Sequence, residues 1–100
     1  MAYFIKQTDE IFPIAADFSD VLATGETIVT ESCEVTAYDS DDIDVSSTIL
    51  VANSKDVLGS ILLIKVQSGT DGKKYKITFK AVTSNSNLYE LDVTMIIKDE

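Results

Sequence analysis

The stretch KYKITFKAVTSNSNLYELDVTMIIK, residues 74–98, decides the fold class. In its first half, apolar side chains occupy every second position: Tyr75, Ile77, Phe79 and Ala81. The alternation resumes in the second half with Tyr89, Leu91, Val93, Met95 and Ile97. Successive side chains of a strand point to opposite faces, so each half predicts a half-buried strand. The intervening SNSN, residues 84–87, consists of turn formers, and the whole stretch therefore predicts an antiparallel hairpin with lysines and carboxylates on one outer face.

Other segments of the chain show the same period of two. Isoleucine, valine and threonine together make up 30 of the 100 residues, and β-branched side chains favour strands. The run 60–67 (SILLIKVQ) is apolar on both faces in its first half, which predicts a central strand. The run 31–39 (ESCEVTAYD) predicts a strand with Cys33 and Ala37 inward and Tyr38 outward. A shorter strand is predicted in 44–51 (DVSSTILV).

The N-terminal part supplies an edge strand and a break. Phe12, Ile14, Ala16 and Phe18 alternate, and Pro13 restricts that strand to a sheet edge. Residues 17–26 (DFSDVLATGE) break the alternation and predict one helical turn, capped by Ser19 and ended by Gly25. About seven short strands with ten-residue spacing predict an all-β fold, an antiparallel β-sandwich that forms a single domain over residues 1–100.

Composition and charge exclude several classes of protein. No apolar run reaches the ~18 residues of a membrane-spanning helix, and the N-terminus has no secretory pattern, so we expect a cytoplasmic protein with no membrane partner. The net charge is −9 and all eight basic residues are lysines, so nucleic-acid binding is not expected. The charge is uneven, since residues 1–60 hold twelve acids and two lysines (−10) and residues 61–100 hold five acids and six lysines (+1).

Few residues are candidates for chemistry. The chain has no histidine, its single cysteine lies in an apolar alternation that predicts burial, and no glycine-rich phosphate loop is present. We therefore expect no enzyme activity and no cofactor. The acidic run 38–44 (YDSDDID) offers weak candidates for a hard cation such as calcium, namely Asp39, Asp41, Asp42 and Asp44. Acidic loops between strands are usually only solvated, and this one lacks the pattern of a helical calcium loop.

Two candidate surfaces remain. The lysines at 74, 76 and 80, with Lys65 as an optional fourth, share one face of the predicted strand. The ordinary explanation is solubility and protection of the sheet from edge pairing. The functional alternative is an interaction face that meets a partner or the acidic first half of a neighbouring subunit. An outward Tyr38 is a weak candidate for stacking a sugar.

The segment 71–77 (DGKKYKI) resembles the tyrosine corner of immunoglobulin-like (Ig-like) domains. In that corner a tyrosine bonds back across the turn and stands two positions before an inward core residue, and here Tyr75 precedes Ile77. The resemblance implies an Ig-like sandwich with Tyr75 as an inward corner residue. It implies nothing about function. Turn chemistry separately predicts that Asp71, four positions before Tyr75, bonds its own backbone in the turn.

The order of segments along the whole chain carries a second resemblance. KQTDE near the start is followed by FPIAADFSDVLATGETI, EVTAYD, IKVQSGTDGKKYKITF and a terminal IIKDE. This order is similar to that of a family of small structural proteins of tailed bacteriophages and prophages, which includes adaptors between the tail and its fibres and head–tail or tail accessory proteins. The resemblance implies an Ig-like virion component, assembled in the bacterial cytoplasm in several copies, whose partners are phage tail or fibre proteins.

Three hypotheses follow for the function. The first is a non-enzymatic assembly protein of a tailed phage or prophage, which docks through strand edges and charged sheet faces. The second is an Ig-like binding module for host-surface carbohydrate or another protein. The third is an independent bacterial domain with some other protein partner.

Overall fold

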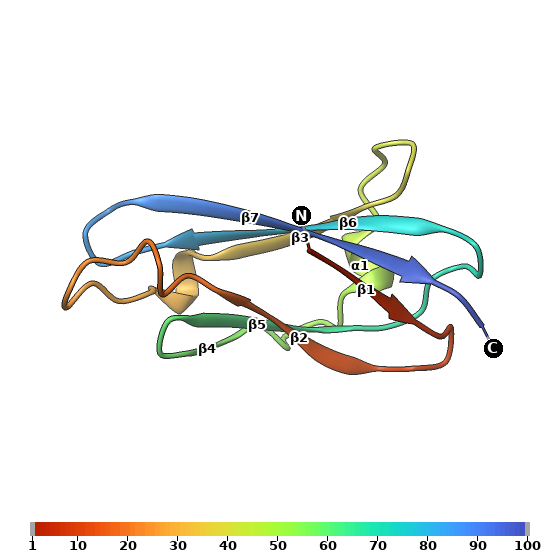
Figure 1. The fold of residues 1–100 in the computed structure, drawn as a ribbon, viewed down its shortest axis with the longest axis horizontal. Coiled ribbons are helices and arrows are strands. Elements are labelled where there is room, and N and C mark those ends of the chain that lie inside the picture. The colour runs from red at the N-terminus through yellow and green to blue at the C-terminus, as the bar shows by residue number, and fades with distance from the viewer. Residues whose placement is uncertain (1, 100) are drawn as a thin grey trace.

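The computed structural model describes residues 2–99, and its regular structure is mainly β-strand (Figure 1). The strands are β1 (Ala2–Lys6), β2 (Phe12–Asp17), β3 (Glu34–Tyr38), β4 (Asp56–Leu58), β5 (Ile61–Val66), β6 (Lys74–Val82) and β7 (Leu88–Ile97). A 3-10 turn, η1 (Thr30–Ser32), precedes β3, and a four-residue helix, α1 (Ser46–Ile49), follows it. Over the described part of the chain, no helix has the length and apolarity needed to cross a bilayer.

The strands form two sheets packed face to face. The four-stranded sheet has the order β1-β7-β6-β3 and the three-stranded sheet the order β2-β5-β4. Figure 1 shows the two layers lying along the long axis of the molecule, with β6 and β7 above β4, β5 and β2. The all-β sandwich with seven strands is therefore confirmed.

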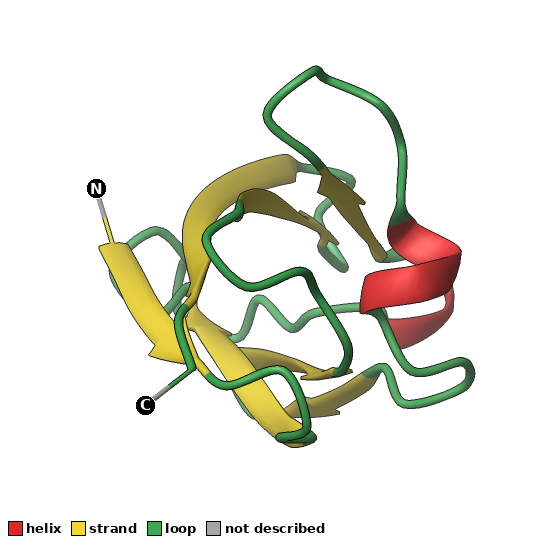
Figure 2. Cartoon of the chain, turned by 90° about the vertical axis from the view of Figure 1, so that its right-hand side faces the viewer, coloured by secondary structure: helices red, strands yellow, loops and turns green. Residues whose placement is uncertain are grey.

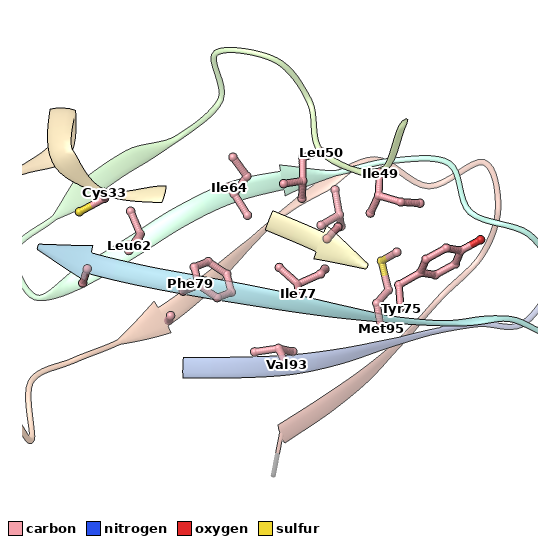
Figure 3. Close-up of a cluster of buried hydrophobic side chains, with 14 of the residues drawn as sticks. Cys33, Ile49, Leu50, Leu62, Ile64, Tyr75, Ile77, Phe79, Val93 and Met95 are labelled. Atoms are coloured by element: carbon pink, nitrogen blue, oxygen red, sulfur yellow. The ribbon is translucent and has the colours of Figure 1, made fainter. Parts of the chain in front are cut away.

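One hydrophobic core fills the space between the sheets. Its fully buried members include Leu62 and Val66 from β5, Ile77 and Phe79 from β6, and Met95 from β7. Figure 3 shows Phe79 and Ile77 pointing from β6 into the space where the side chains of β5 lie. The alternating residues of β6 and β7 are the inward ones, because every second side chain of a strand faces the same layer.

The hairpin register confirms the main prediction. β6 and β7 pair antiparallel from Lys74↔Ile96 to Val82↔Leu88, and the connecting turn is closed by a hydrogen bond from the Thr83 N–H to the Asn87 carbonyl oxygen (2.9 Å). β5 is the central strand of its sheet, as its two-sided apolar pattern predicted. β2 is an edge strand, in agreement with the position of Pro13.

The predicted strand over 44–51 is wrong, because this segment folds as α1. The Asp44 carboxylate accepts hydrogen bonds from the Ser46 N–H (2.9 Å) and the Ser46 hydroxyl (2.6 Å). Such local bonds from Asp and Ser side chains favour a turn over a sheet ladder. Two isolated bridges flank the helix, from Asp44 to Tyr38 of β3 and from Leu50 to Val66 of β5.

The predicted helical turn over 17–26 is also wrong. Ser19 does not cap a helix, since its N–H instead donates to the Asp17 carboxylate (2.9 Å). The segment contains separate turns closed by hydrogen bonds from Val21 to Phe18 (3.1 Å) and from Glu26 to Ala23 (3.0 Å). In the part of the chain that the structure describes, the helical residues lie elsewhere, in η1 and α1.

The strand β1 was not predicted, and it makes the sandwich partly parallel. It pairs in parallel with β7, with Ala2 opposite Val93 and Lys6 opposite Ile97. The prediction of a wholly antiparallel sandwich is therefore wrong at this one edge. A parallel pair leaves no hairpin turn in the sequence to reveal it.

Candidate docking site on the four-stranded sheet

The outer face of the four-stranded sheet carries the lysines singled out in the sequence, but they do not form a uniform row. Lys80 lies between two glutamates, because the register places Glu90 of β7 on one side and Glu34 of β3 on the other. Opposite charges directly across a sheet attract, so the charge of Lys80 is locally balanced.

Lys74 and Lys76 stand in different surroundings. Lys74 is paired with Ile96 and Lys76 with Thr94 on β7, while Tyr38 of β3 lies on the other side of Lys76. The Lys76 Nζ lies 5.7 Å from the centroid of the Tyr38 ring, which is within the range of a cation–π contact. These two lysines therefore share their rows with aromatic, apolar and hydroxyl side chains and with no carboxylate.

β1 extends these rows with exposed apolar side chains. Tyr3 is 68% exposed and pairs with Thr94, and Ile5 is 55% exposed and pairs with Ile96. We define the docking patch as Tyr3, Ile5, Tyr38, Lys74, Lys76 and Ile96. The apolar half of the patch was missed in the sequence, although the alternation in AYFIK (residues 2–6) could have identified it.

The acidic loop 39–44 leaves the sandwich between β3 and α1 and stands out from the sheet in Figure 1. Asp39 organises it, since its carboxylate accepts hydrogen bonds from the Asp41 N–H (2.9 Å) and the Ile43 N–H (3.0 Å). At its end the Ser46 hydroxyl and N–H lower the pKa of Asp44. Among residues 2–99 no three carboxylate or thiol groups come together in a way that could hold a metal ion.

Two hollows adjoin this loop. A pocket of about 410 Å³ lies between the acidic loop and the turn 68–73, with Asp39, Asp41, Ile49, Lys73 and Tyr75 in its wall. A shallower hollow of about 240 Å³ lies on the side of the docking patch and is lined by Asp42, Lys74 and Lys76 among others. The basic end of the patch therefore borders carboxylates of the acidic loop.

The turn 68–73 is mostly exposed, but the tyrosine that follows it points into the core. The Tyr75 ring is buried, and its hydroxyl accepts a hydrogen bond from the Thr70 N–H (3.0 Å). Figure 3 shows the ring beside Met95 in the core. The expected bond of Asp71 to its own turn is wrong, because its carboxylate accepts the N–H of Asp99 (3.0 Å) and so ties the turn to the chain end.

Lys6 completes the same corner and was also missed. Its side chain is fully buried, and its Nζ donates to the carbonyl oxygens of Gln7 (2.7 Å), Thr8 (3.2 Å) and Ser68 (2.8 Å). Burial lowers the pKa of Lys6, while the nearby carboxylates of Glu10, Asp9 and Asp99 act in the opposite direction. The residue joins the end of β1 to the turn before β6.

The single thiol is placed as a core residue. Cys33 is buried, as its alternation predicted, and its Sγ lies 3.2 Å from the Val29 carbonyl oxygen. The chain contains no histidine that could activate it.

Comparison with known proteins assigns the chain to a family. A family model described as "Podophage GP4 fiber-tail adaptor protein gp77" matches residues 6–98, which include the lysines of the docking patch, the acidic loop and the Tyr75 corner. No curated protein matches the sequence. Because the match covers almost the whole chain, the protein belongs to the podophage fibre–tail adaptor family.

Proposed function

We propose that this chain is a non-enzymatic assembly protein of the phage virion, and that it docks to a tail or fibre protein through the docking patch. The observation that carries this proposal is the asymmetry of the lysines on β6. Lys80 is balanced by Glu34 and Glu90, whereas Lys74 and Lys76 are combined with exposed apolar groups.

The composition of the patch suits a protein interface. Interfaces are enriched in aromatic and large apolar side chains at their centre, and charges at the rim steer the encounter. Tyr3 and Ile5 are largely exposed and supply the apolar part, while Lys74 and Lys76 supply positive charge on a chain of net charge −9. A partner surface with apolar side chains and nearby carboxylates would complement both features.

The sheet orders support an Ig-like scaffold for this patch. If β1 to β7 are equated with strands A to G of an Ig domain, the sheets read A-G-F-C and B-E-D. An Ig constant-type sandwich has A-B-E-D and C-F-G, so the two differ only in the sheet that strand A joins. We infer that β1 corresponds to an A strand that has moved beside strand G.

The family match supports the virion as the place of action, because the matching model describes an adaptor between fibre and tail. A role without catalysis agrees with a chain that has no histidine and a buried Cys33. Assembly in the cytoplasm of the bacterial host remains an expectation from the sequence.

The carbohydrate-binding alternative has less support. A sugar platform needs exposed aromatic rings, and Tyr38 is half-buried with Lys76 beside it. The exposed Tyr3 lies at the edge of the sheet next to Ile5, which suits an apolar protein contact better than a polar sugar.

The test uses the purified chain together with the purified tail and fibre proteins of the encoding phage. The variant pair Lys74→Glu/Lys76→Glu reverses the basic part of the patch, and Lys80→Glu is the matched control on the same strand. We expect the pair to weaken binding about tenfold or more and the control to change it less than about threefold. Binding of the unmodified chain should also weaken as salt is raised.

Two results would contradict the proposal. The first is absence of binding to both the tail and the fibre proteins at micromolar concentration. The second is equal loss for Lys80→Glu and for the pair, because a uniform loss would show that only the total charge matters.

A further inference from the structure

The outer edge of β1 is open for backbone pairing. The Lys6 carbonyl oxygen accepts a hydrogen bond from the Lys98 N–H (3.0 Å), so the backbone groups of Lys6 face β7. Alternate residues of a strand direct their N–H and C=O groups to opposite sides. The backbone groups of Tyr3 and Ile5 therefore point away from β7, and Figure 2 shows the strand that starts at the N-terminus at the outer margin of the molecule.

The opposite edge of the same sheet is closed. On β3 the Ala37 N–H donates to the Ser46 Oγ (2.8 Å), and the Ala37 carbonyl oxygen accepts the Val45 N–H (2.8 Å). The Cys33 carbonyl oxygen, just before β3, accepts the Lys55 Nζ (2.6 Å). The short helix α1 and one lysine therefore occupy the row of groups that a further strand would need.

Both edges of the three-stranded sheet carry features that discourage pairing. β2 contains Pro13, which has no N–H to donate. β4 has only three residues and begins with the exposed Asp56. Short strands, prolines and charges are the usual means of protecting an edge, and β1 has none of them, because its only charged residue, Lys6, is buried.

The side chains of β1 show what kind of segment would fit. On the outer face stand Tyr3 and Ile5, both mostly exposed. On the inner face, the Phe4 ring meets the Phe12 ring edge to face with centroids 5.9 Å apart, and both rings are only half-buried at the seam between the sheets. A strand added beside β1 would cover the aromatic seam with one set of side chains and extend the apolar outer face with the other.

We propose that the free edge of β1 receives an extended, uncharged segment of the tail or fibre partner, which adds a fifth strand to the four-stranded sheet. Its side chains are apolar on both faces, to match Phe4 and Phe12 inside and Tyr3 and Ile5 outside. This inference rests on the proposed function, because it specifies how the partner is bound. Main-chain hydrogen bonds then supply affinity and the alternating side chains supply specificity.

A second copy of the chain fits this edge less well. Two chains of net charge −9 repel each other. A contact between two five-residue strands alone is also small compared with the ~1,200 Å² or more that stable interfaces bury, whereas the proposed partner would cover the docking patch as well.

The test replaces the outward-facing N–H of Ile5. Ile5→Pro removes this donor without removing a bond to β7. Ala15→Pro is the matched control on the β2 edge. The Phe18 N–H donates to the Ser60 carbonyl oxygen (2.9 Å) and so faces β5. Because Ala15 is an odd number of residues away from Phe18, its N–H faces outward. Both variants are compared with the unmodified chain for binding to the tail or fibre protein that the preceding experiment identifies, and their melting temperatures are measured.

We expect Ile5→Pro to weaken binding about tenfold or more and Ala15→Pro to change it less than about threefold. In the unmodified chain, the amide hydrogens of Tyr3 and Ile5 should exchange at least about tenfold more slowly in the complex than in the free protein. If Ile5→Pro does not fold, the amide-exchange measurement on the unmodified chain still tests whether the β1 edge pairs with the partner.

Equal binding by Ile5→Pro and the unmodified chain, or unchanged amide exchange at both positions, would overturn the edge inference while leaving the docking patch intact. Failure of the unmodified chain to bind either protein would instead overturn the proposed function. Concentration-dependent dimers that Ile5→Pro abolishes would assign the edge to a second copy and overturn the proposed occupant.

Discussion

Among residues 2–99, one charged side chain is buried at each end of the sandwich, and the two side chains have opposite sign. At one end, Lys6 is fully buried and donates to three backbone carbonyl oxygens. At the other, Glu26 is 7% exposed and accepts hydrogen bonds from the Thr83 hydroxyl, from the Asn87 side-chain amide (3.0 Å) and from the Ala23 N–H (2.9 Å). β7, which connects the two regions, spans roughly 33 Å.

The comparison shows that a buried side chain of either sign can fix the loops at its end of the sandwich through hydrogen bonds. Lys6 donates hydrogen bonds to carbonyl oxygens of the β1–β2 turn and of the turn before β6. Glu26 accepts hydrogen bonds from donors in the 17–26 segment and in the β6–β7 turn. Buried polar groups need partners, and each charged residue satisfies several at once. Four predictions test whether substitutions at the Lys6 end lower the free energy of unfolding more than substitutions elsewhere.

The largest effect is expected from the glycines at the two ends. Gly69 has φ +101°, and a Cβ there would lie 2.6 Å from the Ile97 Cδ1, whereas Gly25 has φ +83° and no atom within 4 Å of such a Cβ. Gly69→Ala should therefore lower the free energy of unfolding by about 3 kcal/mol, the sum of backbone strain and overpacking. Gly25→Ala should cost about 1 kcal/mol. Urea denaturation compares them, and equal losses would show that Ile97 readily moves aside.

Removal of the buried ammonium group should have the next largest effect. Lys6→Met keeps much of the volume but leaves three carbonyl oxygens without this donor, so we expect the unfolding free energy to fall by about 2 kcal/mol. Lys65→Met, at an exposed position of β5, is the control and should have almost no effect. If Lys6→Met were as stable as the unmodified chain, the hydrogen bonds of Lys6 would not stabilise the corner.

The tyrosine corner should contribute less. Tyr75→Phe keeps the ring among the core residues and removes the acceptor of the Thr70 N–H, which predicts a loss of about 1 kcal/mol. Tyr89→Phe, at a half-buried position of β7, serves as the control and should be close to neutral. Equal melting temperatures for the two variants would show that the Tyr75 hydroxyl does not stabilise the fold.

The smallest effect is expected in the pH dependence of stability. Hydrogen bonds from Thr83, Ala23 and Asn87 lower the pKa of Glu26 below its ordinary 4.5, so stability should fall as the pH decreases below about 4.5. Burial lowers the pKa of Lys6 below its ordinary 10.5, so the unfolded chain binds more protons just below that pH and stability should rise as the pH increases toward 10.5.

Both charged residues therefore give a positive slope of stability against pH, in separate windows. Glu26→Gln should reduce only the acidic slope and Lys6→Met only the alkaline one. Denaturant titrations at a series of pH values check this, and a slope that both variants alter equally would contradict the assignment.

The hairpin, the core and the class of fold were readable from the sequence. Tyr75, Ile77, Phe79 and Ala81 alternate without a break, and a period of two leaves one face for the core. Pro13 marked β2 as an edge, and the two-sided apolar pattern of 60–67 marked β5 as central. Each of these conclusions depends on residues close together in the chain.

The segment 44–51 shows where that reasoning fails. Its apolar residues suggested a strand, but Asp44 and Ser46 bond each other locally and α1 results. The helix then closes the β3 edge through Ser46 and Ala37, a contact between positions nine residues apart. Strand propensity and local side-chain bonding compete, and the sequence pattern records only the first.

The sequence by itself thus determined an all-β sandwich, the inward side of its strands and the outward position of Lys74, Lys76 and Lys80. Only the tertiary structure decided that β1 lies in parallel beside β7, that Lys80 is balanced by two glutamates, and that Tyr3 and Ile5 join the other lysines in one patch beside an open edge. The physical reason is the separation along the chain of the residues involved. Alternation is a property of one strand, whereas charge balance and edge exposure depend on which strands become neighbours.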